Sequence, residues 1–207
     1  PTTFAPGDTV TRGQVATFFH RYKGAPSVAV NPASPQCPAP PPPPPPPPFT
    51  FGAGTFLVGV EIPPGIYRAV PTGGCYWERL SGLSGEFGDI IANEFTFDST
   101  LVEIKPSDVA FSADSDCGRF TADLSTGRNP SAPFGGGSYR VGPDVSPGTW
   151  RGSGGSGCYW QRVSGWSGEF GDLIANDFTN ATPTVAISTG DVGFQADSDC
   201  GVWTKIG

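Results

Sequence analysis

The sequence of 207 residues contains no methionine, a single histidine and no long apolar run. No stretch approaches the roughly 18–20 consecutive apolar residues that a membrane-spanning helix needs. Because His20 is the only imidazole, the remainder of the chain cannot supply a Ser-His-Asp triad. These absences predict a protein with no membrane span, no nucleophilic catalysis and no bound cofactor.

Positive charge is also scarce, since 12 Lys and Arg stand against 19 Asp and Glu and leave a net charge of −7. Such a charge repels nucleic acid and anionic lipid, so no nucleic-acid partner is expected. The 30 glycines and 24 prolines interrupt the chain too often for long helices or one large core. Small domains joined by linkers are the better expectation.

The sequence does contain an internal repeat. Residues 51–124 align without a gap with residues 134–207 at an offset of 83, and 38 of the 74 aligned positions are identical. The segment GCYWERLSGLSGEFGDIIANEFT returns as GCYWQRVSGWSGEFGDLIANDFT. Two copies of one domain are therefore predicted, at 51–124 and 134–207, with a linker at 125–133.

Each copy alternates short apolar and aromatic runs with turns rich in Gly, Pro and Asp. In the first copy, residues 66–70, 75–80, 90–97 and 100–104 are such runs. They are too short for helices, and β-branched and aromatic residues fill them. The fold class is expected to be mainly β: two tandem all-β domains, sandwich-like or barrel-like, with six or seven strands each.

Five cysteines are present, and four of them repeat with the domains. Cys75 and Cys117 lie 42 residues apart, as do Cys158 and Cys200, so one disulfide within each copy is the economical prediction. A four-thiolate zinc site would need Cys-x-x-Cys spacing, which is absent. Disulfides form in oxidising compartments, so an extracellular location is expected. Cys37, the odd cysteine, is expected to be free or linked between chains.

Residues 1–50 differ in kind from the repeats. Thr11 and Gln14 form a capping box within residues 1–30, and a short helix is predicted whose apolar face carries Val15, Phe18, Phe19 and Tyr22. Residues 31–50 are rich in proline, and the run at 40–48 predicts a polyproline II linker of roughly 28 Å. A spacer is the plain interpretation, and a ligand for a proline-recognising domain is the alternative.

The motif FAPGDTVTRGQ resembles the last third of an S-layer homology repeat, whose second helix opens with Thr-Arg-Ala-Glu after an F-x-P loop. The matching places are held by Phe4, Pro6, Thr11, Arg12 and Gln14, with Gly13 for Ala and Gln14 for Glu as departures. The resemblance implies attachment to cell-wall polysaccharide, with Thr11 and Arg12 near the sugar and further repeats upstream. The apolar face of the helix would then contact polysaccharide or another subunit. Alternatively, Arg12 is a solvated first-turn residue.

The tandem domains resemble a second group of proteins. The segments VGVEIPPGIY and VGPDVSPGTW are similar to small modules of secreted proteins from high-GC Gram-positive bacteria. We connect no established activity with those modules.

Two acidic motifs recur in both copies. Glu86 with Asp89, repeated as Glu169 with Asp172, pairs carboxylates as glycosidases do, but the Gly-flanked turn favours solvent exposure. The motif DSDCG offers oxygen ligands at alternate positions, which makes weak calcium candidates of Asp114, Asp116, Asp197 and Asp199. Two carboxylates are fewer ligands than a calcium loop usually has. We therefore predict no metal site and no enzyme activity.

Aromatic and basic residues cluster at the same place in each copy, and a sugar-stacking platform would use Tyr76, Trp77, Arg79, Tyr159, Trp160 and Arg162. Neighbouring residues of a strand point to opposite faces, so one of each Tyr-Trp pair must face inward. The alternative, which we favour, places the tryptophan in the core against its disulfide. Asn93 and Asn176 end apolar runs and are expected to satisfy turn backbone.

These features favour a non-enzymatic secreted surface protein that acts as a subunit of a surface layer, stalk or filament. Residues 1–50 carry a charge of +2 and the two repeats together carry −10, which favours head-to-tail contact between chains. A homo-oligomer or filament is therefore the expected assembly. The alternative is a pair of carbohydrate-binding modules anchored to the cell wall, with wall polysaccharide as the partner.

Overall fold

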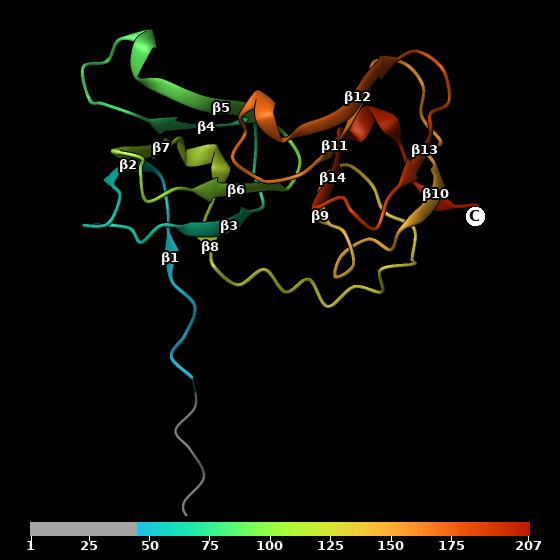
Figure 1. The fold of residues 1–207 in the computed structure, drawn as a ribbon, viewed down its shortest axis with the longest axis horizontal. Coiled ribbons are helices and arrows are strands. Elements are labelled where there is room, and N and C mark those ends of the chain that lie inside the picture. Colours follow the sequence, from blue (N-terminus) through green and yellow to red (C-terminus); the bar gives the residue numbers. More distant parts are fainter. Residues whose placement is uncertain (1–44) are drawn as a thin grey trace, which may run out of the picture. The chain divides into compact units, whose positions relative to one another are not determined.

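The computed structural model describes residues 45–207, and residues Pro46–Gly207 form one compact unit (Figure 1). This unit contains both predicted repeats. The predicted N-terminal helix, the stripe of Val15, Phe18, Phe19 and Tyr22, and Cys37 lie outside the described residues.

Repeat 1 is a sandwich of two antiparallel sheets. One sheet has the order β1-β8-β3-β6 and the other β2-β7-β4-β5. The strand bounds are β1 Thr50–Phe51, β2 Gly54–Leu57, β3 Gly65–Ala69, β4 Cys75–Leu80, β5 Ile90–Thr96, β6 Thr100–Ile104, β7 Ala110–Ala113 and β8 Phe120–Thr121. Strands β5 and β6 are each at the edge of a sheet, and they follow one another in the chain.

Repeat 2 has the same topology, with sheets β12-β11-β14-β9 and β13-β10-β15. The strand bounds are β9 Gly137–Arg140, β10 Gly148–Arg151, β11 Cys158–Val163, β12 Leu173–Thr179, β13 Thr184–Ile187, β14 Gly193–Ala196 and β15 Thr204–Lys205. The counterpart of β1 is reduced to a single bridge between Phe134 and Trp203. Eight strands in repeat 1 and seven in repeat 2 confirm the mainly β prediction.

The alternation of side chains along β4 explains both the core and the outer surface. Cys75, Trp77 and Arg79 point inward and are buried, whereas Tyr76 and Glu78 point outward. The core of repeat 1 gathers around Phe51, Tyr67, Trp77, Phe111 and Phe120, and that of repeat 2 around Phe134, Trp150, Phe194 and Trp203. Tightly packed aromatic rings therefore fill the space between the sheets.

A disulfide fixes the same corner of each sandwich. Cys75 bonds to Cys117 and Cys158 bonds to Cys200, which confirms the predicted pairing. Each bond joins the start of a central strand to the short 3-10 turn that follows the strand beside it. Closing a loop of this length stabilises a small domain by about 4 kcal/mol in the chain-entropy model.

The motif SGEFGD forms the same turn after β4 and after β11. Asp89 accepts hydrogen bonds from the backbone N and the Oγ of Ser84 at 2.6 and 2.7 Å, and Asp172 does the same with Ser167. Gly85 has a φ of +79° and its counterpart Gly168 a φ of +73°, values at which a side chain would be strained. The turn is thus built from its own residues and keeps its shape in both copies.

Among residues 45–207, no helix is long and apolar enough to cross a membrane.

Candidate functional site: the contact between the two repeats

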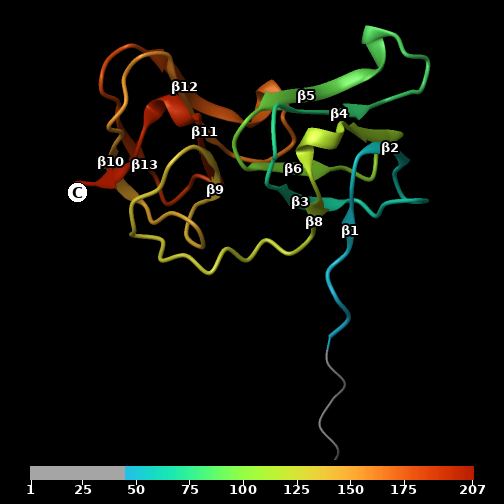
Figure 2. The ribbon, with the colours of Figure 1, turned by 180° about the vertical axis from the view of Figure 1, so that it is seen from behind.

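The repeats contact one another through a loop of repeat 2 that lies against an edge of repeat 1. The loop 164–172, which follows β11, lies beside β5 and β6 in both views (Figures 1 and 2). Trp166 of this loop packs with Leu101 of β6 and with Val163, and Ile66 and Leu124 complete the cluster. The contact therefore has its own small apolar core, separate from the cores of the two sandwiches.

Arg79 is the central polar residue of this contact. Its Nε and Nη2 atoms donate to both oxygens of Asp108 at 2.8 and 2.7 Å. Its third nitrogen, Nη1, reaches repeat 2 and donates to the carbonyl of Ser167 at 2.6 Å and to Glu169 at 2.9 Å. The Arg79 side chain is 1% exposed. A buried guanidinium needs a full set of acceptors, and here both repeats supply them.

Glu169 accepts a second cation from repeat 1, since Lys105 Nζ lies 2.7 Å from the same carboxylate oxygen. Hydrogen bonds from Lys105 and Arg79 lower the pKa of Glu169 to about 2. The carboxylate is therefore ionised at any pH near neutrality, and the link between the repeats is a charged one.

Glu94 of β5 joins a second polar network within the same contact. Its carboxylate accepts hydrogen bonds from the indole Nε1 of Trp77 at 3.0 Å, from Thr100 at 2.5 Å, and from Gln195 of repeat 2. Burial raises the pKa of the Glu94 carboxyl, although these three hydrogen bonds act in the opposite direction. All three donors are uncharged, in contrast to the cations that hold Glu169.

Backbone hydrogen bonds join the repeats in the way that a neighbouring strand pairs with the edge of a sheet. The N–H of Glu103 in β6 donates to the carbonyl of Trp166 at 2.7 Å, and the N–H of Ser138 donates to the carbonyl of Ser99 at 2.8 Å. An edge strand leaves such groups unpaired unless another segment covers them. The loop of repeat 2 therefore covers the free edge of β6.

A further ion pair joins the repeats through β3, the strand beside β6. Arg68 of β3 donates to the buried Asp144 at 2.8 Å, and Arg140 contacts the same carboxylate at 2.9 Å. Burial alone would raise the pKa of Asp144, but hydrogen bonds from Arg140 and Thr126 and the charge of Arg68 outweigh it and lower the pKa. Thr126 belongs to the linker, so this carboxylate also anchors the connection.

The contact uses a different surface of each repeat. We call "edge surface" the β5 and β6 edges of repeat 1 with Arg79 and Lys105, and "groove surface" the outer face of β11 with the loop 164–172 of repeat 2. The edge surface of repeat 1 packs on the groove surface of repeat 2, and a hollow of about 410 Å³ remains between them. Such a contact is heterologous, because it joins two unlike surfaces.

Repeat 1 also has a groove surface, and repeat 2 also has an edge surface. Neither is covered within the described residues. The groove surface of repeat 1, formed by β4 and the loop 81–89, encloses a hollow of about 410 Å³ lined by repeat 1 alone. Leu83 in this loop is 59% exposed, whereas its counterpart Trp166 is 5% exposed. The edge surface of repeat 2, formed by β12 and β13 with Arg162, exposes Thr184 and Ala186.

Gly168 and its counterpart Gly85 show the same difference between the covered and the open loop. A Cβ on Gly168 would lie 3.0 Å from the ring of Trp77 and 3.2 Å from Ala92, because the loop backbone rests directly on them. A Cβ on Gly85, in the equivalent loop, would meet no atom within 4 Å. One loop is packed and its copy is uncovered.

The residues proposed for a sugar platform are separated by the structure. Tyr76 and Tyr159 lie on the outer faces, but Trp77 and Arg79 are buried between the sheets of repeat 1. Trp160 and Arg162 are partly buried in repeat 2. The predicted platform is therefore wrong for Trp77 and Arg79, because strand alternation turns them inward.

Asn93 and Asn176 also differ from expectation. Each lies within a strand, and its side-chain amide donates across to a tyrosine hydroxyl, Asn93 to Tyr76 at 3.1 Å and Asn176 to Tyr159 at 3.2 Å. The prediction of a turn-capping role is wrong, since β5 and β12 extend three residues beyond the asparagines.

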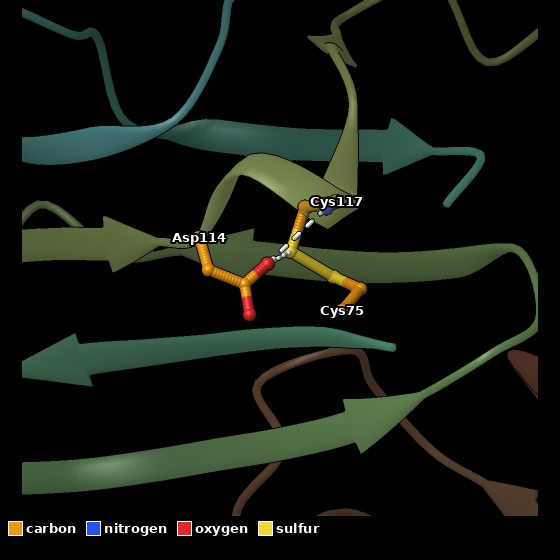
Figure 3. A group of neighbouring side chains, drawn as sticks. All are labelled: Cys75, Asp114 and Cys117. Atoms are coloured by element: carbon orange, nitrogen blue, oxygen red, sulfur yellow. Dashed lines mark hydrogen bonds between the residues drawn. A yellow bond between two sulfur atoms is a disulfide. The ribbon is translucent and has the colours of Figure 1, made fainter. Parts of the chain in front are cut away.

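Two of the four calcium candidates, Asp114 and Asp197, have other roles in the structure. Asp114 accepts from the backbone N–H groups of Asp116 and Cys117 at 3.2 Å and from Tyr76 N at 3.0 Å, so it caps the 3-10 turn. Figure 3 shows its carboxylate beside Cys117, whose sulfur is bonded to Cys75. Asp197 accepts from Tyr159 N in the same way. Asp116 and Asp199 are exposed. The disulfide sulfurs offer no thiolate to a metal.

Sequence reasoning placed Arg79 in a platform and missed the contact made by Arg79, Glu94, Lys105 and Trp166. A signal was present in the differences between the copies. Lys105, Leu101 and Trp166 stand where the other copy has Ser188, Thr184 and Leu83. At these three positions the copy that takes part in the contact has the larger or the charged residue.

We expect Arg79→Ala to lower the free energy of unfolding by about 3–5 kcal/mol, because it strands the buried Asp108 and releases Glu169. Chemical denaturation measures this loss. Arg162→Ala is the matched control: Arg162 makes the same bidentate pair with Asp191 but is 22% exposed and bonds to nothing in the described residues of repeat 1. Equal losses in the two variants would contradict a role for Arg79 between the repeats.

Glu94→Gln should change how stability depends on pH. The folded state holds the Glu94 proton at a pH where the unfolded chain has lost it, so wild-type stability falls as pH rises from the ordinary glutamate pKa through the raised one. The variant cannot titrate and should lack this fall. The measurement is denaturant unfolding of both proteins from about pH 4 to about pH 8, which brackets the ordinary glutamate pKa and a raised one. Parallel curves would show that the Glu94 pKa is not raised.

A family model described as an Rv1352-like extracellular domain matches residues 49–121 and again residues 131–204. Searches among curated proteins and among solved structures found no match. No S-layer homology repeat is indicated, so the resemblance drawn from residues 4–14 is wrong. The contacts that it implied for Thr11 and Arg12 lose that support, and both residues lie outside the described part of the chain. That motif was short and departed from the family at two positions. The two matches cover most of the chain, and the protein therefore belongs to the family of Rv1352-like extracellular domains, which it carries twice in tandem.

Proposed function

We propose that this extracellular protein is a non-enzymatic structural subunit that assembles head to tail with copies of itself. The observation that carries this proposal is the heterologous contact between its repeats. A heterologous contact leaves one unused surface of each kind, here a groove surface on repeat 1 and an edge surface on repeat 2. Such contacts build open filaments unless the rotation between subunits closes a ring.

A non-enzymatic role is supported by the acidic motif that looked most like a catalytic pair. Hydrogen bonds from the hydroxyl and the backbone of Ser84 lower the pKa of Asp89, so this carboxyl is a poor proton donor near neutral pH. Glu169 is held by Arg79 and Lys105 in the other copy. These carboxylates stabilise turns and the contact between repeats.

The proposal predicts concentration-dependent assembly of the full chain without added ligand. Sedimentation velocity over a wide range of concentration, with electron microscopy of the most concentrated sample, should reveal species larger than the monomer. The variant Cys37→Ser should be run in parallel, so that pairing through Cys37 is separated from contact between folded surfaces while the two domain disulfides stay intact. A monomer at every concentration would contradict the proposal.

Carbohydrate binding is a second candidate because of the hollow between the repeats. Its lining includes Phe95, Tyr159 and Phe170 together with Asn93 and Asn176. Phe95 and Phe170 are 62% and 94% exposed. Exposed rings next to side-chain amides suit the apolar faces and the hydroxyl groups of sugars.

A glycan array with the full chain tests this second candidate. Sugar binding in the hollow should be lost in Phe95→Ala, which removes a lining ring, and retained in Phe97→Ala, since Phe97 is similarly exposed but does not line the hollow. Binding that survives Phe95→Ala would place the sugar elsewhere. No binding to any glycan would contradict this second candidate and leave only the structural role.

A further inference from the structure

We infer that the groove surface of repeat 1 is the docking site for the edge surface of repeat 2 in a second copy of this chain. The inference rests on the proposed function and names the surfaces that would carry the assembly. Its strongest support is that an edge surface and a groove surface already bind each other within the chain. There repeat 1 supplies the edge surface and repeat 2 supplies the groove surface.

The open groove is the same structure as the occupied one. Its hollow is lined by the outer residues of β4 and by the loop 81–89, and the counterparts of these residues in β11 and the loop 164–172 line the occupied groove. Both loops contain SGEFGD, and both are held by an aspartate that accepts two hydrogen bonds from a serine. The open groove therefore needs no rearrangement to receive an edge.

The open edge surface of repeat 2 has the same arrangement as the occupied edge surface of repeat 1. Arg162 donates through Nε and Nη2 to Asp191 at 2.7 and 2.8 Å, as Arg79 does to Asp108. Its Nη1, the atom that would cross to a partner, makes no hydrogen bond within residues 45–207. β13 pairs with β10 in the register that β6 uses with β3, so the N–H of Ala186 occupies the place from which Glu103 donates to Trp166.

Charge complementarity between the two open surfaces supports a second copy of the chain as the partner. Glu86 stands in the open groove where Glu169 stands in the occupied one, and it is exposed. Docking of a second copy would place the Glu86 carboxylate at Nη1 of Arg162, as Glu169 lies at Nη1 of Arg79. The unpaired edge of β13 would gain the carbonyl of Leu83 as an acceptor.

The open surfaces are weaker versions of the occupied ones. Leu83 replaces Trp166 in the groove, and Thr184 and Ser188 replace Leu101 and Lys105 on the edge. These changes reduce the apolar contact area and remove one of the two cations around the glutamate. We therefore expect reversible association, tighter at high protein concentration.

Sedimentation velocity of full-length variants tests the assignment. Glu86→Arg places like charges together and should weaken self-association at least about 10-fold. Asp116→Arg is the matched control, because it makes the same charge change at an exposed site outside both surfaces. The triple variant Leu83→Trp, Thr184→Leu and Ser188→Lys copies the occupied contact and should associate at least about 10-fold more tightly.

The outcomes separate this inference from the proposed function. If wild type and Glu86→Arg assemble equally, the surfaces are wrong while self-assembly stands. If wild type and the triple variant both stay monomeric, both proposals fail. Weakening by Asp116→Arg as large as by Glu86→Arg would indicate general charge repulsion and would also overturn the assignment.

Chemical crosslinking identifies the occupant of the groove. A zero-length carbodiimide reagent joins a carboxylate to an amine, so in the variant Ser188→Lys it should join Glu86 of one chain to the amine introduced at position 188 of another. Mass spectrometry of mixed isotope-labelled and unlabelled protein detects this link and shows that it runs between chains. Coupling of Glu86 to Lys23 instead would place residues 1–44 in the groove and would contradict the second copy as partner.

Discussion

The guanidinium of Arg79 is the interaction on which the arrangement of the two repeats depends. Strand alternation turns Arg79 into the space between the sheets, where Asp108 fixes two of its nitrogens and leaves the third at the open edge. A buried cation with one unsatisfied nitrogen is costly, so the acceptors that Ser167 and Glu169 supply are strongly favoured. The loop of repeat 2 is placed by this requirement, and the apolar packing of Trp166 follows from that placement.

Both sandwiches have edge strands that need a cover, but only one of them has that cover within the described residues. Each has consecutive strands at the edges of both sheets, and uncovered edges promote unwanted pairing. In repeat 1 the neighbouring repeat covers the edge. In repeat 2 the same edge stays open within the described residues, yet it keeps the Arg162–Asp191 pair that belongs to a covered edge. Asp191 is buried and Arg162 is 22% exposed, so the pair keeps its geometry although no second repeat lies against it within the described residues.

Much of the fold could be predicted from the sequence, because its determinants are local or duplicated. Strands such as Cys75–Leu80 follow from alternation and β-forming residues, and the cysteine pairs follow from their common spacing. The contact between the repeats could not be predicted, because it joins Arg79 to Ser167 and Glu94 to Gln195 across many residues. Nor does alternation alone reveal that Arg79, a charged residue, belongs on the buried face.

The covalent link between the repeats distinguishes the internal contact from the proposed contact between chains. A short linker holds the edge of repeat 1 near the groove of repeat 2 at a high effective concentration, so even a modest contact forms within the chain. The same contact between separate chains lacks this advantage and loses the full entropy of association. Trp166, Leu101 and Lys105 make the internal contact stronger still. The internal contact is therefore complete at any dilution, while the proposed contact between chains would respond to local protein concentration.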